Sequence, residues 1–210
     1  MKIIDDWRWS FRLLPEALVE LRVRPMGVVH VGAHHGEEVP IYLAAGFERI
    51  TLVEPDPENC AVIAGAPWID TLGIGIVNRA CGSSPGTAKF HRAEVTPFSG
   101  LQRDDRQTQA ASFSVSVVTA ASVQADHPGN VLVVDTQGTE LDALASAALD
   151  PLDLIIIEAQ TERAGAPGAY FPHLLEWCRS AGWTPRIQWR RDARWSDVLL
   201  TPRRQHEPTP

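Results

Sequence analysis

Cysteine is scarce in this 210-residue sequence and never occurs as a Cys-x-x-Cys pair. The three cysteines, Cys60, Cys81 and Cys178, are odd in number and widely spaced, which argues against a disulfide framework and against a structural zinc site. No run of 18 apolar residues is present. The first residues, MKIIDDWRW, lack the apolar centre of a signal peptide. We therefore expect a cytoplasmic protein with reduced thiols.

Positive charge is also in deficit, with 19 lysine and arginine residues against 26 aspartate and glutamate residues and a formal net charge of -7. A chain of this sign offers no broad electrostatic surface to nucleic acid or to an anionic membrane. The apolar fraction of 44% is ordinary for a globular protein. A length of 210 residues is most economically one domain with a sizeable core.

Strand and helix patterns alternate along most of the chain. Short apolar runs predict strands buried on both faces of a parallel sheet, at residues 27–31, 50–54, 74–79, 131–135 and 154–158. Helical patterns follow most of them, at about residues 37–45, 58–64, 140–149 and 169–181. Residues 183–189 and 194–201 are typical of a closing antiparallel pair. The sequence therefore predicts an α/β fold with a doubly wound, mainly parallel sheet and helices on both faces.

Three segments flank or interrupt this pattern. Residues 3–24 carry apolar side chains at three- and four-residue steps, so residues 1–26 are expected to be an N-terminal helical extension of a domain at residues 27–201. Packing on the domain is the default for this extension, with a lid over the site or a homodimer contact as open alternatives. The polar loop at 97–112 is either a lid or an insertion without a role. Residues 202–210 are too polar and proline-rich to pack.

Ligands of open α/β sheets bind at the carboxyl ends of the strands. The segment VVHVGAHHGEEVPIY, residues 28–42, covers the first such end and places Gly32 and Gly36 between a strand and a helix. Glycines there let the backbone approach a ligand, and the helix N-terminus directs N–H groups toward it. The spacing is neither G-x-G-x-x-G nor a Walker A loop, which ends in Gly-Lys-Ser/Thr. A purely structural tight turn is an equal alternative.

An acidic residue, Glu54, ends the next predicted strand, 22 residues after Gly32. A carboxylate at this position can accept hydrogen bonds from both hydroxyls of a ribose. A nucleoside-containing cofactor explains the glycine loop and the acid together. The alternative, in which Glu54 only complements the dipole of the following helix, explains the acid alone.

The opening loop is also dense in residues that can bind a metal, namely His30, His34, His35, Glu37 and Glu38. His34 and His35 are adjacent, a spacing that usually directs two side chains apart. No H-E-x-x-H motif or cysteine pair supports zinc. The sequence therefore predicts no metal site, while Mg²⁺ held by Asp135 and Glu158 at neighbouring strand ends stays open.

Five segments in this order resemble an FkbM-type methyltransferase, a group of class I S-adenosylmethionine-dependent enzymes: VVHVGAHHGEEV, GFERITLVEPDPEN, VNRACGSSPGTAKF, VLVVDTQGTELDAL and LDLIIIEAQ. The resemblance covers residues 27–201, and its GA-x-x-G, EP-x-P and D-x-Q-G-x-E blocks are fairly specific in combination. It implies a Rossmann-like seven-stranded sheet whose last two strands form an antiparallel hairpin. It also implies S-adenosylmethionine as cofactor, and as acceptor a hydroxyl on a sugar, a glycan or a polyketide-like small molecule.

The resemblance assigns roles to residues at the strand ends. The expected cofactor-binding residues are His30, Gly32, Ala33, His34, Gly36, Glu54, Pro55, Ala80, Asp135, Gln137 and Gly138. Within this set the glycine loop would line the methionine and ribose, Glu54 the ribose hydroxyls, and Ala80 the adenine. Gln137 and Gly138 would shape the loop around the methionine tail. His30 is a departure, because many members of the family carry aspartate there.

Methyl transfer from a sulfonium is a direct displacement in which positioning dominates. A hydroxyl acceptor benefits from a general base, because its own pKa lies far above neutral. Asp135 is the first candidate for that base, Glu158 the second and Glu140 the third, and His34 on the opening loop is a further one. For Asp135 the alternative is an N-cap of the following helix, and for His34 a loop-fixing role.

Two other function classes share part of these features. A nicotinamide-dependent oxidoreductase would share the glycine loop and the ribose acid, but the G-x-G-x-x-G spacing and a Tyr-x-x-x-Lys pair are missing. A non-catalytic binding protein on a methyltransferase scaffold would retain Glu54 without turnover.

Overall fold

The computed structural model describes residues 1–5, 10–71, 73–104, 107–160, 168–191 and 194–203. The strands are β1 (Lys2–Asp5), β2 (Gly27–Val31), β3 (Arg49–Val53), β4 (Ile74–Val77), β5 (Ala80–Cys81), β6 (Gly86–Ala93), β7 (Gln109–Val118), β8 (Val131–Val134), β9 (Leu154–Gln160), β10 (Trp183–Arg190) and β11 (Trp195–Pro202). The helices are α1 (Leu14–Leu21), α2 (Val39–Ala45), α3 (Pro57–Ala64), α4 (Ala120–Asp126), α5 (Glu140–Ala145) and α6 (Phe171–Ala181).

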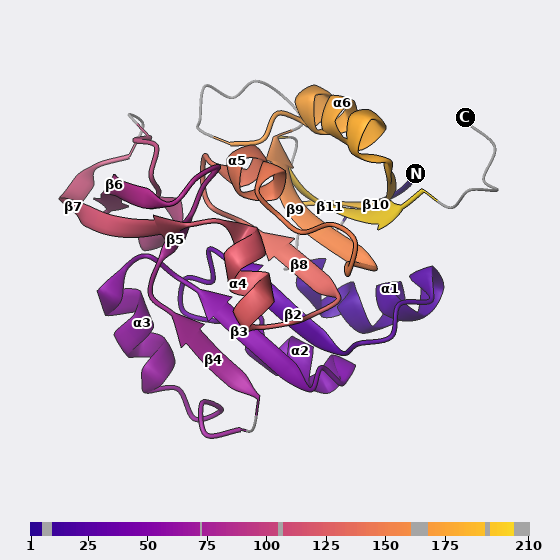
Figure 1. The fold of residues 1–210 in the computed structure, drawn as a ribbon, viewed down its shortest axis with the longest axis horizontal. Helices are drawn as coiled ribbons and strands as arrows, with labels where there is room; N and C mark the ends of the chain where they lie inside the picture. The colour runs from indigo at the N-terminus through magenta and orange to yellow at the C-terminus, as the bar shows by residue number, and fades with distance from the viewer. Residues whose placement is uncertain (6–9, 72, 105–106, 161–167, 192–193, 204–210) are drawn as a thin grey trace.

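Within the described residues the chain forms an eight-stranded sheet in the order β1-β10-β11-β9-β8-β2-β3-β4 (Figure 1). The five strands from β9 to β4 are mutually parallel, and β10 and β11 form an antiparallel hairpin. The predicted α/β class, the mainly parallel sheet and the closing hairpin are therefore confirmed. Helix α4 was not predicted from the sequence.

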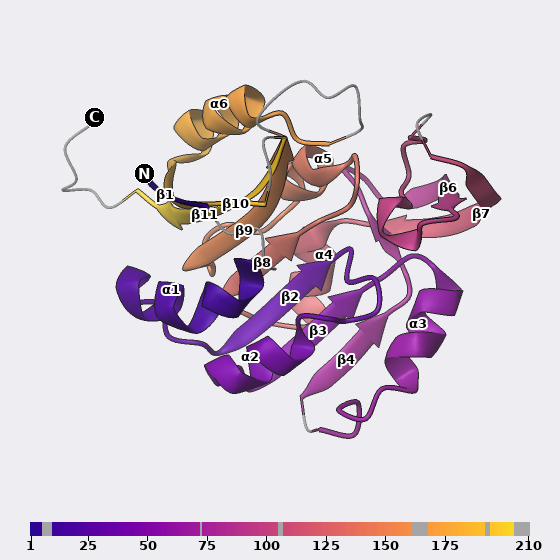
Figure 2. The same ribbon diagram turned by 180° about the vertical axis from the view of Figure 1, so that it is seen from behind.

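Continuous apolar runs form the central strands because both faces of the sheet are covered. In β9, Leu154 and Ile156 join one core cluster while Ile155 and Ile157 join the other. This alternation is the two-residue period of a strand, and it leaves no polar face. Helices α1, α2 and α3 contribute to the first cluster and helices α4, α5 and α6 to the second. Figures 1 and 2 show the two opposite faces, with α4 and α5 in front in one view and α1 and α2 in front in the other.

The N-terminal segment departs from the predicted helix at residues 3–24. Residues Lys2–Asp5 form a strand that pairs in parallel with β10, with Ile4 opposite Trp189. The β-branched side chains of this segment favour a strand, and β10 would otherwise present an open edge. The helix begins only at Leu14. Because β1 joins the main sheet, that sheet has eight strands, whereas the resemblance implies seven.

The segment also packs on the domain rather than extending from it. Phe11 and Leu14 are buried in the first core cluster, and the rings of Phe11 and Trp189 have centroids 6.0 Å apart. Packing, the default role of the N-terminal segment, therefore holds for its described residues. Trp7 and Trp9, which the sequence assigned to the same helix, and residues 204–210 of the predicted tail lie outside the described residues.

A smaller three-stranded sheet, in the order β5-β7-β6, lies beyond the carboxyl ends of the parallel strands (Figures 1 and 2). Its core contains Phe90, Val115 and Val117, and the alternation of these residues with polar ones is typical of strands with one exposed face. The small sheet therefore faces the edge where ligands of such folds bind. Among the described residues, no helix is both long and apolar enough to cross a membrane.

Candidate functional site

The carboxyl ends of the parallel strands open onto a cavity of about 640 Å³. Most residues that the sequence assigned to the site line it, namely His30, Gly32, Ala33, His34, Glu54, Pro55, Ala80, Asp135, Gln137 and Glu158. The facing wall comes from Phe90 of β6 and from the segment between β6 and β7, including Thr96, Phe98 and Leu101. The loop predicted at 97–112 therefore contributes directly to the cavity.

Gly32 places the loop after β2 close against the loop after β8. Its backbone has a φ of 85°, and a β-carbon there would lie 1.7 Å from the carbonyl oxygen of Asp135. Its N–H donates to the Val53 carbonyl at 2.8 Å. Only glycine allows these three strand ends to approach so closely.

Gly36 was expected to contact the cofactor, but it does not line the cavity. It also has a positive φ, of 75°, and a β-carbon there would lie 2.8 Å from the ring of Trp68. Its role is therefore to turn the chain beneath that ring, which is the structural alternative for this glycine. Gly138 likewise lies outside the cavity lining, although its neighbour Gln137 belongs to it.

Glu54 follows β3 and is only 4% exposed. One carboxylate oxygen accepts from the His34 N–H at 2.9 Å, and the other accepts from the Asp56 N–H at 2.9 Å and from the Asn59 amide at 3.3 Å. Burial raises the pKa of Glu54 to about 7, because it outweighs the effect of these hydrogen bonds.

The helix after Glu54 is capped by a different residue. Asp56 is the N-cap of α3 and accepts from the Glu58 N–H at 2.9 Å. Two arginine nitrogens of Arg92, in β6, donate to the Asp56 carboxylate, and the same guanidinium contacts Glu58 at 2.6 Å. The alternative in which Glu54 serves only the helix is therefore weaker, because Asp56 fills that position. The Arg92 contact also fixes the small sheet to α3, a link that the sequence pattern did not reveal.

Asp135 and Glu158 lie side by side at the ends of β8 and β9. The side-chain amide of Gln137 donates to Asp135 Oδ1 at 2.6 Å and to Glu158 Oε2 at 2.8 Å. The guanidinium of Arg191 also contacts the Glu158 carboxylate. Asp135 is not the N-cap of α5, because that helix begins at Glu140 with Thr139 in the cap position. The cap alternative for Asp135 is therefore wrong, and its carboxylate lines the cavity.

The same contacts bear on Mg²⁺, which the sequence left open for Asp135 and Glu158. Glu140 also has an oxygen close to both carboxylates. The amide of Gln137 and the guanidinium of Arg191 already bind these oxygens, and magnesium is therefore not indicated.

Glu140, the third candidate for the general base, is 1% exposed and does not line the cavity. Its Oε1 accepts from the N–H groups of Thr136 and Gly138 and from the Thr136 hydroxyl, and its Oε2 accepts from the Ala169 N–H at 3.0 Å. Glu140 therefore fixes the loop after β8 and cannot act as the base. The sequence pattern could not separate it from Asp135, because both acids occur in the same short motif.

His30 lies in the middle of β2 and is buried, with its Nδ1 3.1 Å from the Tyr42 hydroxyl. Burial lowers the pKa of His30 to about 4, although Asp135 and Glu37 oppose the shift. The ring is therefore neutral at pH 7. His30 lines the cavity and therefore presents a neutral polar group to it. Many members of the family that the sequence resembles carry an aspartate at this position.

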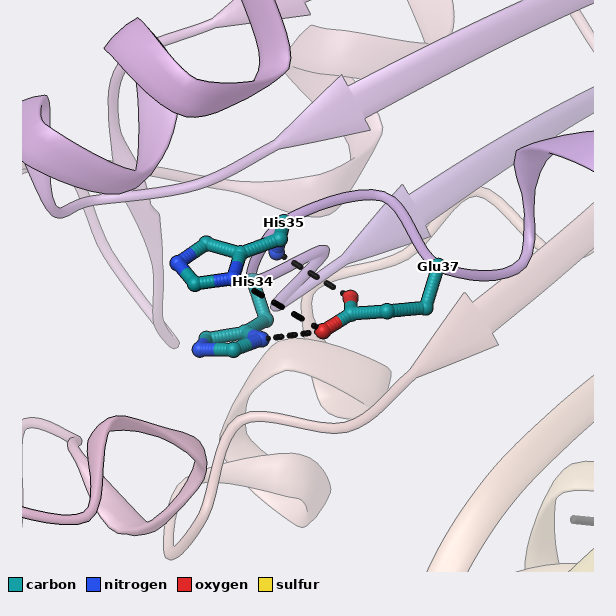
Figure 3. Close-up of side chains that lie close together, drawn as sticks. All are labelled: His34, His35 and Glu37. Carbon is teal, nitrogen blue, oxygen red and sulfur yellow. Dashed lines mark hydrogen bonds and ion pairs between the residues drawn. The ribbon is translucent and has the colours of Figure 1, made fainter. Parts of the chain in front are cut away.

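His34 and His35 do not point apart as their adjacency predicted. Their rings stack with centroids 3.7 Å apart, and both face Glu37 (Figure 3). The reason is the backbone of His34, whose φ of 47° turns its side chain toward that of His35. His34 Nδ1 lies 2.6 Å from Glu37, and His34 Nε2 lies 2.9 Å from the Thr96 hydroxyl. Burial opposes charge on His34, but the hydrogen bond and charge of Glu37 outweigh it and raise its pKa.

Residues missed by the sequence analysis complete the lining. Asn59 donates its amide to Glu54 and faces the ring of His35 with its carbonyl, so one side chain joins both halves of the site. Arg191 and Trp195, which belong to the basic, aromatic turn of the closing hairpin, also line the cavity. The only sequence signal for them was the composition of that turn, WRRDARW.

A model of a known protein family matches the part of the chain that forms this site. The profile described as Methyltransferase FkbM domain matches residues 30–183, which is well over half of the chain. The chain belongs to the FkbM methyltransferase family. The matched FkbM region runs from β2 to the start of β10 and contains Glu54, Asp135 and Glu158. No curated protein matches the sequence.

Solved structures agree with the fold of this FkbM family member. The methyltransferase FkbM from Methylobacillus flagellatus KT superposes with a TM-score of 0.57 at 17% identity, over 85% of this chain and 44% of that one. This chain thus spans less than half of that protein. A 1,6-didemethyltoxoflavin-N1-methyltransferase from Burkholderia thailandensis, bound to 1,6-didemethyltoxoflavin and S-adenosylhomocysteine, superposes with a TM-score of 0.53 at 16% identity, over 93% and 79% of the two chains. At these identities the match shows a class I methyltransferase fold.

Proposed function

We propose that this FkbM family protein transfers a methyl group from S-adenosylmethionine to a hydroxyl of a small acceptor. The observation that carries the proposal is the buried carboxylate of Glu54, which lines the same cavity as Asp135. A carboxylate after β3 can accept hydrogen bonds from ribose hydroxyls, and Asp135 follows β8 in the lining of the same cavity. In an FkbM fold this pairing supports a nucleoside cofactor held next to a general base.

The size of the cavity supports a cofactor together with an acceptor. A volume of about 640 Å³ lies within the range of roughly 300–1,000 Å³ for small-molecule sites. The structural relative from Burkholderia thailandensis was solved with a small acceptor and S-adenosylhomocysteine bound together. We therefore infer a sugar, glycan or polyketide-like acceptor rather than nucleic acid, in keeping with the net charge of -7.

In the proposed reaction Glu54 and the loop after β2 would hold S-adenosylmethionine, which would supply the methyl group to the acceptor oxygen and be released as S-adenosylhomocysteine. The hydroxyl proton passes to Asp135, whose carboxylate faces the cavity. Gln137 orients that carboxylate through its amide, and Glu158 takes the second hydrogen bond from the same amide. Phe90 and the segment around Thr96 exclude water from the reacting atoms.

Calorimetry with S-adenosylhomocysteine tests the cofactor assignment. We expect the wild-type protein to bind and Glu54→Gln not to bind. The amide replaces one acceptor oxygen with an NH2 group, which would face the ribose hydroxyls or the N–H groups that now donate to Glu54. Glu48→Gln is the matched control, since Glu48 is exposed just before the opposite end of β3. Binding of NADH in place of S-adenosylhomocysteine would replace this proposal with the oxidoreductase alternative.

The pH dependence of binding provides a second check. The pKa of Glu54 is about 7, and ribose hydroxyls donate to its ionised form. Binding below pH 7 must therefore release a proton, so the Kd for S-adenosylhomocysteine should rise as the pH falls, by up to about tenfold per pH unit, and level off above pH 7. His34 also has a raised pKa, but its ring faces Glu37. A Kd that stays constant from about pH 6 to pH 8 in the wild type would contradict the ionised-Glu54 contact.

A further inference from the structure

Three side chains of the loop after β2 converge at the rim of the cavity. Figure 3 shows the stacked rings of His34 and His35 with the carboxylate of Glu37 beside their edges. Glu37 Oε1 lies 2.6 Å from His34 Nδ1 and 3.9 Å from His35 Nδ1. One potential ligand atom of each residue lies within 4.8 Å of the other two. Zinc binds nitrogen and oxygen at about 2.0–2.2 Å, so the donors around it lie about 3–3.5 Å apart. Binding therefore requires side-chain rotations that move Glu37 Oε1 away from His34 Nδ1 and toward His35 Nδ1.

Contacts on the far side of each ring fix its orientation. The Asn59 amide donates to Glu54, so its carbonyl oxygen faces His35 Nε2 at 3.1 Å and accepts a hydrogen bond from it. In the neutral ring the proton of His35 is therefore on Nε2, and the lone pair of Nδ1 is on the side of Glu37. His34 also has an oxygen partner on its second nitrogen, because its Nε2 lies 2.9 Å from the Thr96 hydroxyl. Histidines that bind metals have such oxygen partners on their second nitrogen.

The two Nδ1 atoms and the Glu37 carboxylate therefore border one small region. Without an ion, the short contact between His34 Nδ1 and Glu37 requires a proton on that nitrogen. That proton forms the hydrogen bond between His34 and Glu37. Glu37 cannot donate a hydrogen bond to the lone pair of His35 Nδ1, because an ionised carboxylate only accepts. A cation at the centre of the three atoms would satisfy all of them.

We propose that His34, His35 and Glu37 bind one divalent transition-metal ion. The ligands would be the Nδ1 atoms of the two histidines and a carboxylate oxygen, with the remaining positions held by water. Two imidazoles and one carboxylate suit zinc, cobalt or nickel, whereas magnesium and calcium prefer oxygen alone. The ion would also stiffen the loop, because His34 contacts Thr96 and His35 contacts Asn59 of α3.

Zinc titration of the full chain tests the site. Protein prepared without a histidine tag and freed of metal with a chelator is titrated with ZnCl₂ by calorimetry, and Co²⁺ in place of zinc gives a visible spectrum that reports nitrogen ligation. We expect one ion per chain. Loss of a residue that only contacts a metal ligand typically weakens metal binding about 10–100-fold. His35→Ala and Glu37→Gln remove a ligand itself, so each should weaken zinc binding at least about tenfold.

The control is His173→Ala, which removes an exposed histidine from α6 and should leave zinc binding unchanged. Glu37→Gln is the conservative variant at an exposed side chain, so its circular dichroism should match that of the wild type. Absence of zinc binding, or binding that both site variants retain at full strength, overturns the proposal. The measurement uses neither cofactor nor acceptor, so its result is independent of methyl transfer.

Discussion

Asp135→Asn should lower the rate of methyl transfer by about 10²–10⁴-fold while S-adenosylhomocysteine still binds. The amide has the shape of the carboxylate, and its oxygen can still accept from Gln137, which donates to Asp135 Oδ1 at 2.6 Å. What the variant loses is the ability to take the proton of the acceptor hydroxyl. The rate is measured as transfer of a labelled methyl group to an acceptor found by screening sugars, glycans and polyketide-like alcohols.

Two further variants make the outcome for Asp135 decisive. Glu158→Gln alters the second candidate base, which already contacts Gln137 and Arg191, and should lower the rate less than Asp135→Asn. Asp126→Asn, at an exposed position in α4, should change nothing. If Asp135→Asn retains the full rate, Asp135 is not the base. If no acceptor is methylated by the wild type although the cofactor binds, the non-catalytic alternative is favoured.

The strands and the site could be predicted because each depends on local pattern. The run LIII at 154–157 is apolar at every position, which only a strand covered on both faces tolerates, and such strands end at the ligand edge. That rule selects Glu54 and Asp135, and both line the cavity. It also selects Gly36 and Glu140, which do not line it, because the residue type alone does not show whether a position faces the cavity. A glycine under Trp68 and a glycine at a ligand are identical in sequence.

Other features depend on contacts between distant parts of the chain. β1 exists because β10, about 180 residues later, offers an edge, and its two isoleucines favour a strand too weakly to distinguish it from the start of a helix. His34, whose ring stacks on that of His35, has a positive φ of 47°, which is uncommon for a residue other than glycine and cannot be predicted from periodicity. The Arg92 contact with Asp56 joins the small sheet to α3 across 36 residues. Sequence periodicity describes which face is buried, but it does not describe such long-range pairing.

Among the glycines of the described residues, Gly32→Ala should destabilise the fold the most. The alanine β-carbon would lie 1.7 Å from the Asp135 carbonyl oxygen, so two strand ends must separate. A positive φ in a non-glycine residue costs about 1–3 kcal/mol, and overpacking costs about 1–3 kcal/mol more. Cofactor binding should be lost as well, because the displaced loop carries His34, whose N–H donates to Glu54. Urea unfolding measures the first effect and calorimetry the second.

Two glycines of the same chain separate these contributions. Gly182 has a φ of 75° with nothing within 4 Å of an added β-carbon, so Gly182→Ala reports the backbone cost alone. Gly86 has neither a positive φ nor a close neighbour, so Gly86→Ala should change the free energy of unfolding by less than about 0.5 kcal/mol. The expected order of destabilisation is Gly32 above Gly182 above Gly86. If Gly32→Ala lowers the free energy of unfolding no more than Gly182→Ala does, the loops after β2 and β8 do not approach each other closely in solution. Asp135 would then not be packed against the loop after β2.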